Sequence, residues 1–178
     1  MRRQTSVFVT LIALMSLNCI TALAQTEQSN MLIMGSATFA TSSKSGSSTT
    51  TLELSPRAYY FLQDYVAVGG RLELNRVSNG GSVTTFGIGP DGVYFFKMDS
   101  KELLPFAGIG LVYNAASSSF NGRSSSQSGF TVALHGGIAY LLRDHLSLFP
   151  ELEFDIGSGD AAPSTAISLG VGIAGFLY

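Results

Sequence analysis

The sequence has few charged residues and almost no cysteine. Aspartate, glutamate, lysine and arginine make up 12% of its 178 residues, against about 25% in a typical soluble domain. The single cysteine is Cys19. Leu17 and Asn18 precede it, whereas a lipoprotein signal places small residues there. We therefore expect Cys19 to be removed with an N-terminal signal, which excludes disulfides, thiolate nucleophiles and cysteine metal sites from the mature chain.

Long apolar runs are also absent beyond the N-terminal region. Apolar residues make up 46% of the chain, yet no later segment approaches the run of about 18 apolar residues that a transmembrane helix needs. A helical membrane protein is therefore not expected. A chain that is apolar overall, poor in charge and without a helical span is typical of a membrane β-barrel.

The N-terminus predicts a secretory signal peptide. Met1–Arg3 provides a positive charge, Val7–Met15 an apolar segment, and Ala22–Ala24 the small-x-small pattern that a signal peptidase requires. Cleavage is expected before Gln25. The alternative, an N-terminal membrane anchor, is disfavoured because the apolar stretch is shorter than the roughly 20 residues of a span.

Removal of residues 1–24 would leave one domain, residues 25–178, in the bacterial outer membrane. Arg2 and Arg3 leave with the signal, so 8 basic and 12 acidic residues remain and the formal charge is −4. Such a chain has no basic patch for nucleic acid, and a nucleic-acid partner is not expected. About 150 residues suit a single domain.

Two kinds of separator divide the mature chain. Short ones close an apolar segment with an aromatic residue and turn at a polar pair, at Tyr60–Asp64, Tyr94–Asp99 and Tyr140–Asp144. The other kind is rich in serine and glycine and is expected to form flexible loops. These loops are Thr41–Ser48, Ser78–Ser82, Ala115–Ser128 and Gly157–Ser164.

The separators delimit eight segments, each long enough for a tilted strand to cross a bilayer. The predicted strands are residues 31–41, 49–61, 65–77, 83–97, 103–115, 128–142, 145–157 and 164–178. We therefore predict an all-β fold, an eight-stranded antiparallel up-and-down transmembrane β-barrel. Its short turns should be periplasmic and its long loops extracellular.

Polar and apolar residues alternate along these segments. In the second segment, for example, Glu53 and Arg57 lie on the face opposite Leu52 and Leu54. A membrane barrel turns the apolar face outward to lipid, whereas a soluble lipocalin-like barrel, the competing fold, turns it inward. In the membrane barrel the lumen would collect a polar network of Glu53, Arg57, Arg71, Glu73, Asp91, His135, Glu151, Glu153 and Asp155.

Aromatic residues gather near both ends of the segments, as two membrane interfaces would require. The belt at the short turns is predicted to contain Tyr60, Tyr94, Tyr140, Phe176 and Tyr178, and Tyr59, Phe61, Phe95 and Phe96 lie beside the same turns. The belt at the long loops would contain Phe39, Phe86, Tyr113 and Phe130. With Leu177 facing lipid, Tyr178 falls on the inner face, and a bulge or fraying near Gly175 would be needed to bring it outward.

Pro56 and Pro90 lie inside predicted strands, where proline removes a backbone hydrogen-bond donor. A β-bulge at each position would accommodate the missing donor.

Several stretches resemble the small outer-membrane β-barrels of the broad OmpA/OmpX-like group. They are Gly35–Phe39, Leu54–Phe61, Phe86–Phe96, Leu104–Gly110 and Gly136–Tyr140. The resemblance implies an eight-stranded antiparallel barrel that contacts outer-membrane lipid and lipopolysaccharide. It also implies insertion by the barrel assembly machinery, for which the terminal Phe176-Leu177-Tyr178 resembles the recognition signal. A monomer without cofactor is expected.

The charges of the lumen leave more than one function open. Two arginines face six carboxylates in the predicted network, and buried charges must be paired or hydrated. The first hypothesis is a non-enzymatic barrel that contributes to envelope structure or surface interaction. The alternative is a narrow cation-preferring pore or small-solute binder. A metal site is not expected, because Glu151, Glu153 and Asp155 spread along one strand by about 6.6 Å per step.

A lipid A-modifying enzyme is the third hypothesis. His145 and Ser147 have the H-x-S spacing of lipid A deacylases, in which histidine and serine act as base and nucleophile. Here the pair directly follows the turn at Arg143-Asp144, whereas that family places its site near the outer leaflet. Catalysis is therefore not expected.

Overall fold

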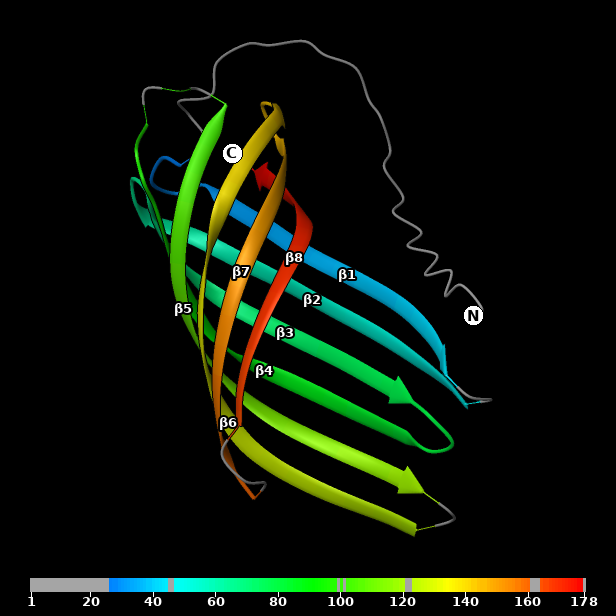
Figure 1. The fold of residues 1–178 in the computed structure, drawn as a ribbon. Helices are drawn as coiled ribbons and strands as arrows, with labels where there is room; N and C mark the ends of the chain where they lie inside the picture. Colours follow the sequence, from blue (N-terminus) through cyan, green and yellow to red (C-terminus); the bar gives the residue numbers. More distant parts are fainter. Residues whose placement is uncertain are drawn as a thin grey trace.

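The computed structural model describes residues 26–44, 47–98, 100, 102–120, 123–160 and 164–177. In these ranges eight strands form one closed antiparallel barrel, in which each strand pairs with its neighbours in the chain and the first meets the last (Figure 1). The predicted fold class is therefore confirmed. The predicted signal peptide, residues 1–24, and Tyr178 lie outside the described residues. Across the described ranges, no helix has the length and apolar content to cross a membrane.

The strands coincide with the predicted segments, although several are longer. They are β1 (Met31–Lys44), β2 (Ser47–Gln63), β3 (Val66–Ser78), β4 (Ser82–Phe95), β5 (Leu103–Phe120), β6 (Arg123–Arg143), β7 (Leu146–Gly159) and β8 (Ser164–Leu177).

Two of the predicted flexible loops are instead paired strands. Across Thr41–Ser48 the ladder of β1 and β2 continues to Lys44 opposite Ser47. Across Ala115–Ser128 the ladder of β5 and β6 continues to Phe120 opposite Arg123. Serine and threonine are compatible with a strand, and threonine favours it. The serine-rich composition of these segments therefore indicates contact with water, and it does not indicate that strand pairing ends there.

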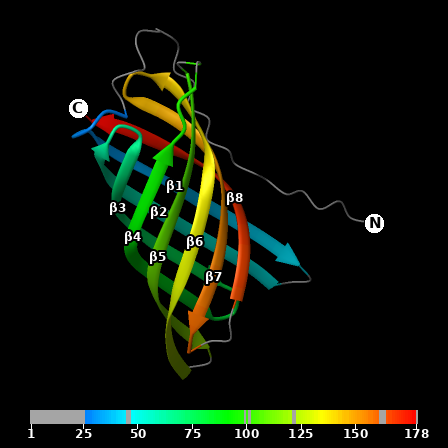
Figure 2. The same ribbon diagram turned by 90° about the vertical axis from the view of Figure 1, so that its left-hand side faces the viewer.

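The register of the strands sets the tilt and the width of the barrel. Following paired residues once around the wall from Leu32 leads to Ala166 in β8. Ala166 lies ten residues before Phe176, the direct partner of Leu32. With eight strands this shear corresponds to a tilt of about 40° and a radius of about 8 Å. The oblique course of the strands is visible in both views (Figures 1 and 2), and such an interior is just wide enough for side chains to fill it.

The apolar side chains of the strands face outward. Ile88 on β4, Ile109 on β5 and Leu152 on β7 are 50–57% exposed on the outer surface, whereas Arg57 and Arg71 are almost completely buried inside. This is the arrangement of a barrel that is solvated by lipid, and it is the reverse of a soluble barrel. The alternation alone is compatible with either orientation, and the structure turns the apolar face outward, as predicted for the membrane barrel.

The interior at the short-turn end is packed with apolar side chains, which we call the plug. Phe95 lies at its centre, with ring centroids 5.8 Å from both Phe61 and Phe106 and 6.4 Å from Phe176. The plug consists of Leu32, Met34, Tyr59, Phe61, Ala67, Val93, Phe95, Leu104, Phe106, Ala139, Leu141, Phe149, Ala174 and Phe176. It spans the lumen with side chains from all eight strands.

Neither proline introduces a bulge. The register is the same on both sides of Pro56 and on both sides of Pro90. The ladder only lacks pairs at these residues, because proline has no N–H to donate. The register shifts in fact occur at Phe61/Gln63 and Leu141/Arg143, beside the short turns. Neither proline is therefore accommodated by a bulge.

The residues before β1 close the short-turn end. The amide of Ser29 donates to the carbonyl of Phe61 at 2.9 Å, and the amide of Tyr65 donates to the carbonyl of Thr26 at 2.8 Å. Ser29 and Tyr65 both adopt positive φ angles, of 77° and 67°. Thr26 is 4% exposed, so this segment lies as a cap over the turn between β2 and β3.

Candidate functional site

A network of ion pairs fills the lumen directly above the plug. It joins seven of the predicted lumen residues, which come from β2, β3, β4, β6 and β7. These residues are Arg57, Arg71, Glu73, Asp91, His135, Glu151 and Glu153. Each lies at an inward position of its strand, because side chains alternate between the two faces of a sheet.

Arg57 binds two carboxylates of β7. Its Nη1 and Nη2 donate to Oε2 and Oε1 of Glu151 at 2.6 and 2.7 Å, and Nη2 also donates to Oε2 of Glu153 at 3.0 Å. The side chain of Arg57 is 4% exposed and that of Glu151 is 9% exposed. A two-pronged guanidinium–carboxylate pair of this kind is the strongest form of charged hydrogen bond, and it ties β2 to β7 across the lumen.

Arg71 is the other centre of the network and is almost completely buried. Its Nη2 lies 2.8 Å from Oε1 and Oε2 of Glu153 and 2.8 Å from Oε1 of Glu73. Its Nη1 donates to Oδ2 of Asp91 at 3.4 Å. One guanidinium thus contacts three carboxylates, so removal of its charge would leave Glu73 without an ion pair and would weaken the pairing of Asp91 and Glu153.

His135 lies between two of the carboxylates. Its Nε2 is 3.0 Å from Oδ1 of Asp91, and its Nδ1 is 3.3 Å from Oε2 of Glu151. A histidine donates from both ring nitrogens only when it is doubly protonated, so the arrangement is satisfied by an imidazolium. The ring lies 6.3 Å from that of Phe106, centroid to centroid, and thus rests on the plug.

Two glycines of β5 make room for the network. A Cβ atom on Gly108 would lie 2.4 Å from the His135 ring, and one on Gly110 would lie 3.0 Å from Asp91 and 3.2 Å from Arg71. These glycines belong to the site, although they are not among the predicted lumen residues. The sequence pattern could have indicated them, since both glycines occupy inward positions of β5, and this strand contributes no charged residue.

The two remaining predicted lumen residues lie outside the network. Glu53 is exposed and Asp155 is half-buried on the long-hairpin side of Arg57 and Arg71. In the part of the chain that the structure describes, neither forms an ion pair. The network of seven therefore has a more open, acidic region above it, which we call the vestibule.

The aromatic residues predicted for the short-turn belt divide into two groups. Tyr60, Tyr94 and Tyr140 point outward and are 45%, 47% and 43% exposed. Phe176, by contrast, is 1% exposed and belongs to the plug. Its assignment to the belt is wrong, because the outward position of Leu177 places its neighbour inside. Tyr178 lies outside the described residues.

At the other end, the predicted aromatics all face outward. Phe39, Phe86, Tyr113 and Phe130 are 44–73% exposed. Along β4 and β6 they lie eight and ten residues from Tyr94 and Tyr140. At about 3.3 Å per residue and a tilt of about 40°, this spacing gives a band about 20–25 Å high. This agrees with the apolar band of an outer-membrane barrel, which is about 25 Å tall.

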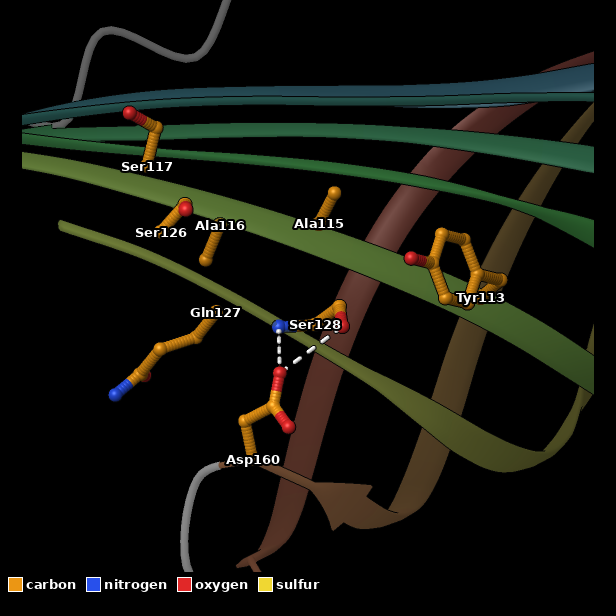
Figure 3. A pocket seen from close by; sticks show the side chains of 8 residues that line it. All are labelled: Tyr113, Ala115, Ala116, Ser117, Ser126, Gln127, Ser128 and Asp160. Atoms are coloured by element: carbon orange, nitrogen blue, oxygen red, sulfur yellow. Dashed lines mark hydrogen bonds between the residues drawn. The ribbon is translucent and has the colours of Figure 1, made fainter.

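A shallow polar pocket of about 350 Å³ lies where the β5–β6 hairpin leaves the barrel (Figure 3). Tyr113 lines one end, and Asp160, after β7, lines another. The carboxylate of Asp160 accepts hydrogen bonds from the amide and the hydroxyl of Ser128, both at 3.0 Å. Asp160 thus ties the base of the hairpin to the end of β7.

The suspected H-x-S pair is not arranged for catalysis. Ser147 is 0% exposed inside the barrel, and its Oγ has no hydrogen-bond partner among the described residues. A nucleophilic serine needs a base within hydrogen-bonding reach and a path for the substrate. Across the same residues, no group of three or more histidine, cysteine or acidic side chains is placed to hold a metal ion.

The chain matches one protein family and is similar in fold to several solved structures. Residues 10–174 match the sequence profile of the outer membrane protein beta-barrel domain. The fold is similar to that of the neisserial surface protein A NspA, with a TM-score of 0.59 and 18% identity over 83% of this chain and 96% of that one. It is also similar to OprG from Pseudomonas aeruginosa, with a TM-score of 0.55 and 13% identity over 85% and 97%.

The N-terminal barrel domain of Pseudomonas aeruginosa OprF gives a TM-score of 0.51 and 16% identity over 85% of this chain and 98% of that one. No curated protein sequence matches the chain significantly. The three structures share the fold of this chain at low sequence identity, and this chain aligns with almost the full length of each.

Proposed function

The chain belongs to the outer membrane protein beta-barrel domain family, and from this premise we propose that it is a sealed, non-enzymatic barrel of the bacterial outer membrane. It anchors a serine-rich hairpin surface on the extracellular side and contributes to envelope structure or surface interaction. The signal in residues 1–24 exports it, and the barrel assembly machinery inserts it as a monomer.

The plug is the observation that carries this proposal. Phe61, Phe95 and Phe176 are each at most 1% exposed, although each points into the lumen. In a barrel with a radius of about 8 Å, a layer of such rings leaves no continuous water path. The lumen is therefore blocked at the short-turn end.

The ion-pair network is a second barrier above the first. Arg57 and Arg71 cross the lumen to reach Glu151 and Glu153 on the opposite wall. A narrow cation pore would need carboxylates that are free to replace water around an ion. Here Asp91, Glu151 and Glu153 are already held by guanidinium and imidazole groups. The pore alternative is therefore disfavoured.

Among the described strands β5 and β6 are the longest, with 18 and 21 residues, and their hairpin extends beyond the membrane band. Tyr113 and Phe130 form an aromatic pair with ring centroids 5.3 Å apart. Beyond this pair the two strands continue with residues 115–120 and 123–128, in which Ser117, Ser119 and Ser126 are exposed. Small hydroxyl side chains on a paired ribbon suit contact with lipopolysaccharide or with other polar surfaces.

Conductance through a planar lipid bilayer tests the sealed lumen. The wild-type barrel should give no steady channels, because the plug blocks the path. Phe95→Ala combined with Phe106→Ala should introduce conductance by hollowing the plug. Phe96→Ala is the matched control, since Phe96 is adjacent in sequence but faces outward. A steady wild-type conductance that Glu151→Gln or Glu153→Gln abolishes would instead establish the cation pore.

Fractionation tests the location. The protein should be recovered with the outer membrane, and its electrophoretic mobility should change on boiling, as a heat-resistant barrel requires. Recovery in the soluble periplasm without a mobility change would contradict the proposal.

A further inference from the structure

The seam between β1 and β8 is paired over only part of its length. Five residue pairs join the two strands, from Met31–Leu177 to Gly35–Ile173. The other seven seams contain 11 to 18 pairs. Beyond Gly35 the strands separate, and Figure 1 shows β1 and β8 diverging toward the long hairpins. Within the described residues, Ser36–Lys44 and Ser164–Gly172 have no partner along these edges.

The unpaired edges begin within the membrane band. Phe39, a member of the long-hairpin belt, is 73% exposed, and Ile167 and Leu169 on β8 are 71% and 79% exposed. These are the highest exposures among the large apolar side chains. Open edges carry unpaired N–H and C=O groups, which the hydrocarbon of a bilayer does not accept unless they are buried or hydrated.

The register of the paired part already defines a partner for each free edge. Continued without a shift, it places Ala37 opposite Val171 and Phe39 opposite Leu169, with all four side chains outward. On the inner face it would place Thr38 opposite Gly170, where an added Cβ meets nothing within 4 Å. Apart from Lys44 at the end of β1, neither free edge contains a charged residue. The two edges therefore match in the side chains that they direct outward and inward and in the apolar character of their outer face.

The groups beside the split oppose its closure. Glu53 is paired with Thr38 from the β2 side, and Asp155 is paired with Ala166 from the β7 side. Both carboxylates belong to the acidic vestibule and lack an ion pair among the described residues. If the seam closed, β2 and β7 would be separated by three strand spacings, which is about 14 Å along the wall. Like charges then approach each other in a region that contains less water.

We propose that the long-hairpin half of the β1–β8 seam is a lateral gate with two states. In the closed state Ser36–Lys44 pairs with Ser164–Gly172 in the continued register. In the open state, the one in the structure, the vestibule communicates sideways with the adjacent leaflet. Backbone pairing favours closure, and the charges of Glu53 and Asp155 favour opening. The gate lies above the plug, so it does not depend on whether the barrel conducts.

Distances between spin labels across the seam test this proposal in lipid bilayers. The labels are placed by Ala37→Cys and Val171→Cys in a Cys19→Ser background. Two distance populations are expected, and Glu53→Gln with Asp155→Asn should increase the shorter one by about twofold or more. Labels at Met31→Cys and Leu177→Cys are the control, since this part of the seam is paired and should give one short distance.

Three results would overturn the gate. A single short distance in the wild-type background would mean that the barrel is permanently closed. A single long distance that the two neutralising substitutions leave unchanged would mean that the seam never closes. A short distance that disappears when labelled protein is diluted with unlabelled protein would assign the free edges to a second copy of the chain.

Discussion

The two halves of the lumen are built from different chemistry although the same strands form both. At the short-turn end, inward positions carry phenylalanine and aliphatic side chains that exclude water. Toward the long hairpins, inward positions carry acidic and small residues such as Glu53, Asp155 and Gly170. The ion-pair network lies at the boundary. Seven of the eight seams are paired through both halves, and only the β1–β8 seam is unpaired toward the long hairpins. The difference in packing therefore depends mainly on which side chains occupy the inward positions.

The boundary also explains why the network can hold buried charge. Arg57 and Arg71 are nearly inaccessible, and an isolated charge at such a depth would be strongly unfavourable. Here each guanidinium faces at least two carboxylates. The apolar plug below excludes competing water, so these interactions are stronger than they would be in the vestibule.

Removal of the central charge should have the largest effect. Arg71→Met leaves Glu73, Asp91 and Glu153 without their shared guanidinium. Breaking a buried ion pair in this way costs about 3–5 kcal/mol. The free energy of unfolding, measured by urea titration of the barrel in lipid vesicles, should fall by this amount. Arg76→Met is the control, because Arg76 is exposed on the same strand and its loss should change stability by less than about 0.5 kcal/mol. Equal losses for the two variants would refute the role of the network.

The plug should be the next most sensitive region. Phe176→Ala opens a cavity among packed rings, which typically costs about 3 kcal/mol or more. Leu177→Ala changes the adjacent residue, which faces lipid and is 49% exposed, and should cost less than half as much. Refolding the purified chains into lipid vesicles separates this effect from any influence of the C-terminus on cellular assembly. If Leu177→Ala were the more harmful variant, the inward position of Phe176 would be in error.

Steric tolerance should distinguish the two halves directly. Gly108→Ala brings a Cβ to 2.4 Å from the His135 ring and 2.7 Å from the Gly92 carbonyl, and overpacking of this kind costs about 1–3 kcal/mol. Gly170→Ala adds the same methyl group in the open half, where nothing lies within 4 Å. It should be neutral or slightly stabilising, because alanine restricts the unfolded chain. Parallel urea titrations give the comparison, and equal destabilisation would mean that both halves are packed.

The alternation of polar and apolar residues predicts part of this difference between the two halves of the lumen, but not all of it. The period of two places Arg57, Arg71 and Glu153 on the polar faces of their strands, and the assignment as a membrane barrel turns these faces inward. Neither argument says which side chains meet across the lumen. That depends on the shear, which is a property of all eight registers together. The same period places Phe176 inside once Leu177 faces lipid. The distance of an aromatic residue from a turn does not distinguish plug from belt, because residues of both kinds occur at the same height in the barrel.

The extent of the hairpins could not be inferred for a different reason. Serine-rich segments such as Ala115–Ser128 lack the apolar alternation that distinguishes a strand from a loop. Backbone pairing with the neighbouring strand keeps this segment extended, and pairing leaves no trace in composition. The hydroxyl side chains indicate only that the segment is surrounded by water.

The smallest predicted effect concerns the base of the β5–β6 hairpin, beyond both halves of the lumen. Asp160→Ala removes the acceptor for the amide and hydroxyl of Ser128. Both residues lie near the surface, so the unfolding free energy should change by no more than about 1 kcal/mol. Hydrogen exchange at the Ser128 amide should nevertheless become faster, because its donor is released to water. Ser126→Ala, which leaves this contact intact, should not change that rate. Unchanged exchange in Asp160→Ala would mean that strand pairing alone fixes the hairpin, and the ordered wall would then extend well beyond the membrane band without help from side chains.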